Sequence, residues 1–340
     1  MRLAGSKPRL ILQFLRRSTD KKIILRDVHN LVQRLKRERR TASTVEERLE
    51  LVLRSFCSSE GNSATVFVDY KKTAQTIAVQ SHQMHRFFEA FPQIVLLDST
   101  HNTNASRYKL FSFMVNDVFG QGQYVQHALV ENESHACMKD AILAFKKGNP
   151  SWDEIRVFMI DKDFSEVSLL RQAFPRATVL LCWFHVKKYL RAEMAKSEYG
   201  GRYTYDMEKV EDSVDMMIRA DSRASYMKGL RYMYYMLDCH DESGDLPEPV
   251  HPLLQYFIKN WDSCKEMWSA YGRAGLAHLG NNTNNRLEAS WGSLKDILKP
   301  EMGVDECIET LLFLETAAEM EYASKFNVVG SRLYHDAMNS

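Results

Sequence analysis

The sequence contains no long run of apolar residues. Stretches such as Ile94–Leu97 and Val179–Cys182 are only a few residues long, whereas about 20 consecutive apolar residues are needed to cross a bilayer. The N-terminus is basic and lacks the apolar segment of a secretory signal peptide. We therefore expect an intracellular protein that is neither secreted nor embedded in a membrane.

Cysteine is scarce and irregularly spaced. The six cysteines stand at positions 57, 137, 182, 239, 264 and 307. They do not form the framework that is typical of a small secreted domain held together by disulfides. We expect them to be reduced thiols.

Charge is unevenly distributed, although the formal net charge is only +1. Residues 1–40 contain 13 Lys and Arg but 3 Asp and Glu, a balance of +10, which leaves −9 for the rest of the chain. A basic arm on an acidic body favours a polyanion such as DNA as the partner of the arm. A solvated helix or a disordered leader explains the same pattern. The run Lys36–Arg40 resembles a nuclear import signal, which places the protein in the nucleus, but such short runs also arise by chance.

The middle of the chain alternates between strand and helix patterns. Strands are predicted at 94–98, 110–115, 124–130, 155–160 and 178–182, and helices near 135–147 and 164–174. Three strands in succession, then helix, strand, helix and strand, indicate an α/β fold with a mixed five-stranded sheet. A helix over 8–38, a second one around 49–56 and a short β pair at 65–69 and 76–80 are expected before it.

The last part of the chain has helical periodicity. Apolar stripes run through 207–217 and 226–237, and further helices are predicted at 253–268, 281–298 and 304–326. The helix at 281–298 turns Leu287, Trp291, Leu294 and Leu298 inward. We expect four regions, namely a basic helical part with the β pair (1–80), the first part of the sheet domain (81–190), an all-helical insertion (191–280) and the helices that complete the domain (281–340).

Three carboxylates stand where chemistry is expected. Asp98 and Asp161 end two predicted central strands, at the sheet edge where α/β proteins bind ligands. Glu288 lies beside the apolar stripe of a later helix. Hard oxygen ligands suit Mg²⁺ or Mn²⁺, and two such ions can assist phosphoryl transfer on nucleic acid. Strand-end aspartates also often only cap the following turn, so on spacing alone both readings stay open.

The residues around these carboxylates resemble a known family. Three blocks carry the resemblance: 91–104 (FPQIVLLDSTHNTN), then 158–163 (FMIDKD) with Phe174-Pro175 and 182–185 (CWFH), and 281–288 (NNTNNRLE). They are similar to Mutator-like (MULE) transposases and most of all to the animal zinc finger SWIM domain-containing proteins. The resemblance covers about 80–195 and 278–298. It implies an RNase H-like fold, a helical insertion before the last catalytic helix, and a DDE triad of Asp98, Asp161 and Glu288 that binds Mg²⁺ or Mn²⁺ and cleaves and transfers DNA strands.

The sequence also departs from that family. A SWIM finger needs a Cys-x-Cys pair, which occurs nowhere in this sequence, and no clear N-terminal zinc domain is present. Cys182 and His185 supply half of a zinc site, with Cys264 and His278 as unsupported partners, so we expect no zinc within the chain. We expect instead that Cys182 packs and that His185 lies near the acidic cluster, where it can hydrogen bond a carboxylate or a phosphate.

Three functions remain open at this stage. The first is a DNA-acting DDE enzyme with DNA bound by the basic arm and by the acidic cleft. The second is a catalytically inactive nuclear regulator or adaptor that kept the transposase fold, which the acidic body and the missing zinc modules favour. The third is a metal-dependent ribonuclease with the same chemistry. Self-association into a homo-oligomer is left open as well.

Overall fold

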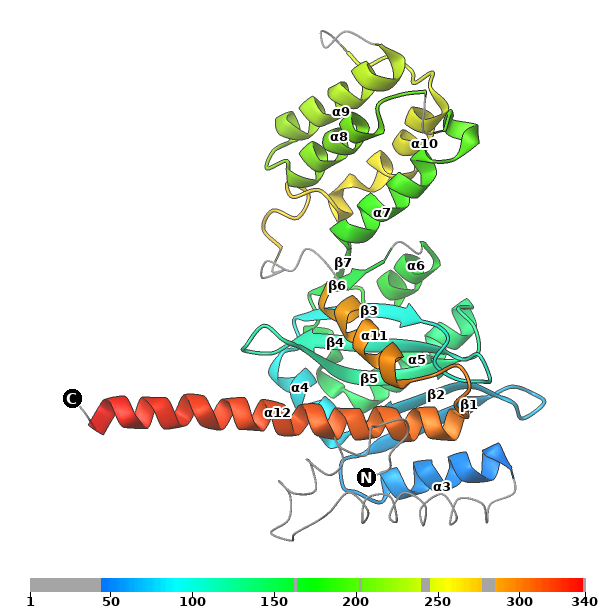
Figure 1. Cartoon of the computed structure of the whole chain (residues 1–340), viewed down its shortest axis with the longest axis vertical. Helices are drawn as coiled ribbons and strands as arrows, with labels where there is room; N and C mark the ends of the chain where they lie inside the picture. Colours follow the sequence, from blue (N-terminus) through cyan, green and yellow to red (C-terminus); the bar gives the residue numbers. More distant parts are fainter. Residues whose placement is uncertain (1–43, 162–163, 202–203, 240–244, 277–284, 339–340) are drawn as a thin grey trace. The chain divides into compact units, whose positions relative to one another are not determined.

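The computed structural model describes residues 44–161, 164–201, 204–239, 245–276 and 285–338. Within these residues seven strands form one sheet, in the order β1-β2-β5-β4-β3-β6-β7 (Figure 1). The strands are β1 (Ser63–Val68), β2 (Ala74–Gln80), β3 (Ile94–Thr100), β4 (Lys109–Asn116), β5 (Gly122–Val130), β6 (Val157–Ile160) and β7 (Thr178–Leu181). The pairs β1–β2, β2–β5 and β4–β5 are antiparallel, and β3–β6 and β6–β7 are parallel. The sheet is therefore mixed, and the α/β class is confirmed.

The expected count of five strands was wrong. The β pair near residue 70 is a hairpin, as predicted, but it also joins the sheet because β2 pairs with β5, with Thr76 opposite Val130 and Val79 opposite His127. A hairpin contains its own partner within a few residues, so its sequence pattern is complete without the sheet. Its attachment to β5 depends on residues about 50 positions away, which no local pattern reveals.

Most helices lie where the apolar periodicity predicted them, and the helix over 82–90 was not predicted. They are α3 (Val45–Cys57), α4 (His82–Ala90), α5 (His135–Gly148), α6 (Phe164–Ala173), α7 (Trp183–Met194), α8 (Met207–Arg219), α9 (Arg223–Asp238), α10 (Pro252–Asn260), α11 (Asn285–Ile297) and α12 (Val304–Met338). Ser134 caps α5 by accepting a hydrogen bond from the backbone N–H of Cys137. The helix expected over 8–38 lies outside the described residues.

Two helix bounds differ from expectation. The helix predicted over 253–268 ends at Asn260 and is followed by a 3-10 helix, Asp262–Met267. The Trp268 indole N–H donates a hydrogen bond to the carbonyl oxygen of Trp261 at 2.9 Å. If the α-helix continued, this carbonyl would accept a backbone N–H instead. At the other end, α12 runs to Met338 rather than stopping near 326.

The chain divides into two compact units. The first comprises Met1–Phe91, Asp98–Pro150 and Glu288–Ser340, and the second comprises Pro92–Leu97 and Ser151–Leu287. Strand β3 therefore contributes its first residues to the second unit and Asp98 to the first. The four regions expected from the sequence stay a prediction.

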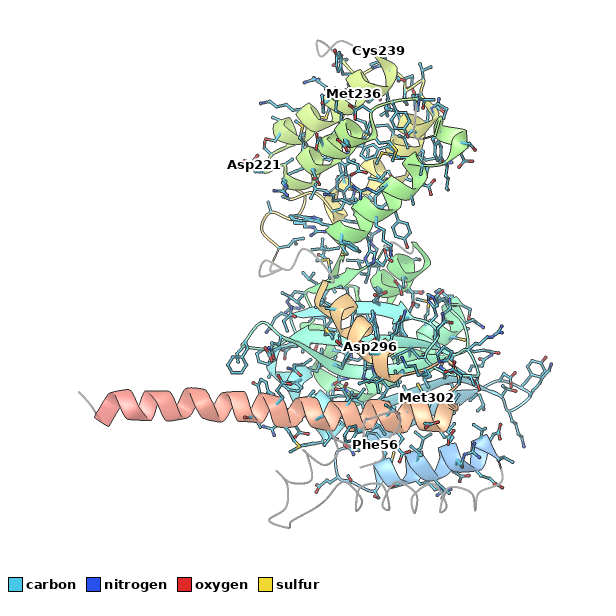
Figure 2. All side chains as sticks on the ribbon, viewed as in Figure 1. Phe56, Asp221, Met236, Cys239, Asp296 and Met302 are labelled. Carbon is cyan, nitrogen blue, oxygen red and sulfur yellow. The ribbon has the colours of Figure 1, made fainter. Side chains whose placement is uncertain are left out.

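The first unit buries its central strands on both faces. Nearly every residue of β4 and β5 is buried, the pattern of strands that are covered on each side. Helices α4 and α5 cover one face, where the ring of Phe145 stacks on Phe113 at 4.5 Å and meets the edge of Phe88 at 5.0 Å. Trp291 of α11 packs near Tyr124 of β5, with ring centroids 5.8 Å apart. The turn after α11, marked by Met302 in Figure 2, accepts a hydrogen bond at the Met302 carbonyl from the Ala105 backbone N–H.

The second unit combines β6 and β7 with helices. Between Trp183 and residue 276 the described residues form helices and turns without a strand. The two predicted stripes meet where α8 packs on α9: Val210, Val214 and Met217 are buried, as are Tyr226, Leu230 and Met233. A Cβ on Gly229 would come within 2.8 Å of Met217 Cγ and 3.0 Å of the Ser213 carbonyl oxygen, so the glycine permits this close approach.

None of the helices in the described part of the chain is long and apolar enough to cross a membrane.

Candidate functional site

Asp98 lies in β3, two residues before its end, and is partly exposed. One carboxylate oxygen, Oδ1, accepts a hydrogen bond from the Ser99 backbone N–H at 2.7 Å. The other, Oδ2, accepts one from the indole Nε1 of Trp291 at 3.1 Å. The carboxylate is thus held from its own strand and from α11, a helix 193 residues later in the chain.

Helix α11 carries Glu288 one turn before Trp291. Residues three positions apart lie on the same face of a helix, so Glu288 stands on the face of α11 that also carries Trp291. A Cβ built on Gly292, four positions after Glu288, would meet no atom within 4 Å. The Glu288 side chain lies outside what the structure describes.

The predicted inner face of α11 is confirmed. Leu287, Trp291, Leu294 and Leu298 are all buried. Tyr124 of β5 also anchors the helix, because its hydroxyl donates a hydrogen bond to Ser290 Oγ at 2.8 Å. Burial raises the pKa of Tyr124 far above its usual value, so the phenol keeps its proton and remains a donor at any physiological pH.

A polar chain continues from the residue after Asp98. Ser99 Oγ donates a hydrogen bond to Glu133 Oε1 at 2.6 Å, and Glu133 also forms an ion pair with Lys109 of β4. These groups hold the end of β3 against its neighbour. They were not singled out from the sequence, because Glu133 and Lys109 carry no local pattern.

Asp161 directly follows β6 and belongs to the second unit. Its Oδ2 accepts a hydrogen bond from the Tyr189 hydroxyl at 3.1 Å and lies 3.7 Å from His185 Nε2. His185 and Tyr189 are four residues apart in α7, so both lie on one face of that helix. His185 therefore lies beside Asp161, and its place next to a cluster of acids stays a prediction.

Cys182 is a packed residue at the start of α7. It is fully buried, and its backbone N–H donates to the Ile160 carbonyl at 2.8 Å. This bond brings the start of α7 next to the end of β6 and so places His185 one turn into the helix beside Asp161. Cys264 donates through its thiol to backbone carbonyls, and His278 lies outside the described residues.

A buried arginine supports the same corner of the second unit. Arg273 is 1% exposed, donates hydrogen bonds to the carbonyl oxygens of Leu181 and Met267, and stacks on Trp183 at 5.1 Å. Burial lowers the pKa of its guanidinium. Because it fixes the residue before Cys182, Arg273 holds the β7–α7 junction in place.

Among the described side chains, no group of three or more His, Cys, Asp and Glu is arranged to hold a metal ion. Glu288 is not among those side chains, and Asp98 and Asp161 belong to different units. The convergence of the three carboxylates therefore stays a prediction.

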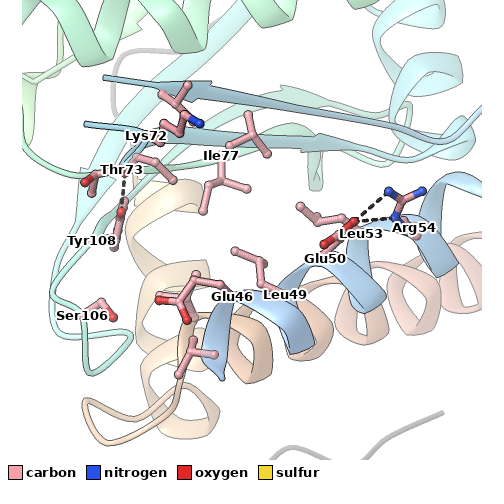
Figure 3. A pocket seen from close by; sticks show the side chains of 15 residues that line it. Glu46, Leu49, Glu50, Leu53, Arg54, Lys72, Thr73, Ile77, Ser106 and Tyr108 are labelled. Carbon is pink, nitrogen blue, oxygen red and sulfur yellow. Dashed lines mark hydrogen bonds and ion pairs between the residues drawn. The ribbon is translucent and has the colours of Figure 1, made fainter. Parts of the chain in front are cut away.

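A separate pocket lies in the first unit (Figure 3). It has a volume of about 610 Å³ and is formed by α3, β1, β2 and the first residue of α12. Leu49, Leu53 and Ile77 give it an apolar lining, and an ion pair between Arg54 and Glu50 stands at one end. Neither Asp98 nor Asp161 lines this pocket, and we assign no chemistry to it.

Sequence reasoning missed the two aromatic donors. Trp291 was predicted to be a core residue, which its 5% exposure confirms, but its hydrogen bond to Asp98 was not foreseen. Tyr189 was not singled out at all. The available signal was spacing, since Trp291 stands three residues after Glu288 and Tyr189 four residues after His185.

The sheet and the placement of the aspartates define the class of this domain. In the sheet, the antiparallel strands β4 and β5 lie on one side of a parallel set formed by β3, β6 and β7, and one aspartate stands near the end of each of β3 and β6. This is an RNase H-like fold.

A family model agrees with that class. Residues 54–180 match the model described as "Zinc finger SWIM domain-containing protein 1/3, RNaseH-like domain". The match spans β1 to β7, includes Asp98 and Asp161, and ends before Cys182, His185 and Glu288. It confirms the resemblance to the RNase H-like domain of these SWIM proteins over this range.

Proposed function

We propose that this chain is a transposase-derived DDE nuclease or strand transferase that acts on DNA by divalent-metal phosphoryl transfer. One observation carries the proposal. The hydrogen bond between Trp291 and Asp98 joins the helix of Glu288 to the first aspartate of the expected triad. The two acids are 190 residues apart in the sequence, and this contact between α11 and Asp98 supports the expectation that they act together.

The residues fit the ion that this chemistry requires. Carboxylate oxygens are the ligands that Mg²⁺ and Mn²⁺ prefer. A carboxylate offers about four acceptor positions, and Asp98 uses its own to accept hydrogen bonds from Ser99 and Trp291 among others. Asp98, Asp161 and Glu288 would hold the ions. When bound, such ions lower the pKa of an attacking water or hydroxyl and stabilise the charge on the leaving oxygen.

The protein's own groups would orient the reactants. In the reaction an oxygen nucleophile loses its proton and bonds to phosphorus, the bond from phosphorus to the leaving oxygen breaks, and that oxygen takes up a proton. His185, next to Asp161, is positioned to donate a hydrogen bond to a phosphate oxygen. The basic residues 1–40 would add charge for DNA, with affinity falling on the order of a thousandfold between 50 and 200 mM salt for about six phosphate contacts.

Cleavage of labelled duplex DNA with Mn²⁺ tests the proposal. Asp161→Ala and Glu288→Gln should abolish cleavage, whereas Glu301→Gln, an exposed glutamate in the turn after α11, should leave it unchanged. Glu288→Gln removes charge with little change of shape and relieves repulsion among the acids, so the metal-free variant should fold as well as the wild type.

Thermal melting with Mn²⁺ separates the enzyme from the alternative, an inactive nuclear adaptor. A functional metal site should stabilise the fold by about 2.7 kcal/mol at a hundredfold excess of Mn²⁺ over its dissociation constant. A protein that gains no stability from Mn²⁺ and cleaves no DNA would support the adaptor. Cleavage of RNA but not DNA would support a ribonuclease.

A further inference from the structure

Each of the two aspartates accepts a hydrogen bond from an aromatic side chain. Trp291 Nε1 donates to Asp98 Oδ2 in the first unit, and the Tyr189 hydroxyl donates to Asp161 Oδ2 in the second, both at 3.1 Å. The two donors stand on different helices, α11 and α7. The same contact, a hydrogen bond from an aromatic side chain to an aspartate carboxylate, therefore occurs twice, in unrelated parts of the sequence.

These donors differ from the cationic partners that some other carboxylates of this protein have. Asp305 pairs with Arg48 and Asp215 with Lys187, at 3.0 and 2.8 Å. A cationic partner cancels the charge of a carboxylate, which opposes the binding of a further cation. An indole N–H or a phenol O–H is neutral, so it can fix the direction of the carboxylate without adding a positive charge of its own.

Two tryptophans of the second unit show the ordinary arrangement. The indole N–H groups of Trp183 and Trp268 donate to backbone carbonyl oxygens, those of Trp268 and Trp261, at 2.5 and 2.9 Å. A buried indole needs a hydrogen-bond partner, and a carbonyl satisfies that need. Trp291 donates instead to an ionisable oxygen beside the helix of Glu288, which goes beyond what packing requires.

We propose that Trp291 and Tyr189 are positioning residues that hold the carboxylates of Asp98 and Asp161 in the orientation needed for a divalent cation. The proposal rests on the function proposed above and extends it to the side chains that donate hydrogen bonds to the metal-binding carboxylates. Hydrogen-bond partners of metal ligands typically contribute 10–100-fold to metal affinity. Trp291 also becomes a reporter, because an ion on Asp98 changes the electrostatic surroundings of the indole.

The experiment measures Mn²⁺ affinity of the full chain by calorimetry, without DNA. Trp291→Phe and Tyr189→Phe each delete the donor and keep an aromatic ring. Each should weaken Mn²⁺ binding by about 10–100-fold. The matched controls are Trp152→Phe, at the 3-10 helix Pro150–Glu154, and Tyr235→Phe, whose side chain on α9 is 51% exposed. Both controls should bind as the wild type does.

A second readout uses tryptophan fluorescence with Mg²⁺. The emission of the wild type and of Trp152→Phe should change as Mg²⁺ is added, and that change should be lost in Trp291→Phe. A merely structural role for Trp291 would lower the melting temperature of Trp291→Phe and leave the Mn²⁺ affinity of the folded fraction unaltered. Tyr189→Phe removes a single hydroxyl from a side chain that is 38% exposed, so it tests the idea even if Trp291→Phe folds poorly.

The outcomes distinguish this inference from the proposed function. If Asp98→Asn and Asp161→Asn lose Mn²⁺ binding while both phenylalanine variants keep wild-type affinity, the positioning role is overturned and the metal site stands. If the asparagine variants bind as tightly as the wild type, the proposed function itself fails. A loss in one phenylalanine variant alone overturns the assignment of the other residue.

Discussion

The two units satisfy their buried polar groups in different ways. In the first unit side chains pair with one another across strands and helices, as His127 does with Ser112 at 2.7 Å and with Glu315 at 3.1 Å. In the second unit the buried guanidinium of Arg273 instead binds the backbone carbonyl oxygens of Leu181 and Met267. Side chains thus link distant elements of the first unit, whereas Arg273 holds the backbone at one junction of the second.

The largest expected effect therefore falls on Arg273. Arg273→Ala removes the donors of the Leu181 and Met267 carbonyls and leaves a cavity beside Trp183, which should lower the free energy of unfolding by about 3–4 kcal/mol. Urea denaturation measures it. Arg223→Ala, at the exposed start of α9, is the control and should change little. A loss below about 1 kcal/mol for Arg273→Ala would show that Arg273 does not hold the β7–α7 junction in place.

A smaller effect is expected for a single member of the network in the first unit. His127→Phe leaves Ser112 and Glu315 without their histidine partner and should cost about 1–3 kcal/mol. Ser112→Ala deletes one neutral hydrogen bond and should cost about 1 kcal/mol. In a double-mutant cycle by urea denaturation the two changes should be strongly non-additive, because both remove the same bond. Additive losses would show that the network is not coupled.

The same substitution in the two units should have opposite signs. Gly229→Ala in α9 forces a Cβ against Met217 and the Ser213 carbonyl and should destabilise by about 1–3 kcal/mol. Gly292→Ala in α11 meets no atom within 4 Å and should stabilise by about 0.5–1 kcal/mol, because alanine favours the helix. Thermal denaturation of the two variants compares them directly. Equal signs would mean that the helix packing at one of these sites differs from the structure.

The smallest effect concerns pH. Burial lowers the pKa of His251, whose Nδ1 accepts the backbone N–H of Leu253 at the start of α10. The folded state therefore binds fewer protons than the unfolded state, so stability is full above the usual histidine pKa of about 6.5 and declines as the pH falls below it. His251→Asn keeps a capping acceptor without titrating. This variant should show a shallower loss of melting temperature between pH 7 and 5, and an unchanged slope would exclude the role of His251.

The strands and most helices could be predicted because their signals are local. Apolar runs such as Ile94–Leu97 identify buried strands, and the stripe around Trp291 gives the inner face of α11. The pairing of β2 with β5 and the partners of Trp291 and Tyr189 depend on contacts between distant segments. Such contacts cannot be read from the periodicity of either segment. The observed sheet therefore has two more strands than predicted, and the aromatic donors were missed.

The candidate site was partly accessible from the sequence. Asp98 and Asp161 were found because carboxylates after apolar strands are conspicuous, and His185 because it shares the CWFH block with Cys182. The position of α7 next to Asp161 could not be predicted. It depends on a backbone hydrogen bond from the Cys182 N–H to the Ile160 carbonyl oxygen, which sets α7 beside the strand. A backbone bond of this kind is independent of residue type and cannot be inferred from the side chains.

The order of the segments also governs when the site can exist during synthesis. Asp98 and Trp291 are 193 residues apart, and at about 5–20 residues per second the ribosome needs on the order of 10–40 s to add that length. During this interval the nascent chain carries the first aspartate without α11 and without Glu288. The hydrogen bond between the Asp98 carboxylate and the Trp291 indole can therefore form only after α11 has emerged, so Asp98 lacks this partner while the helical segments between them are being made.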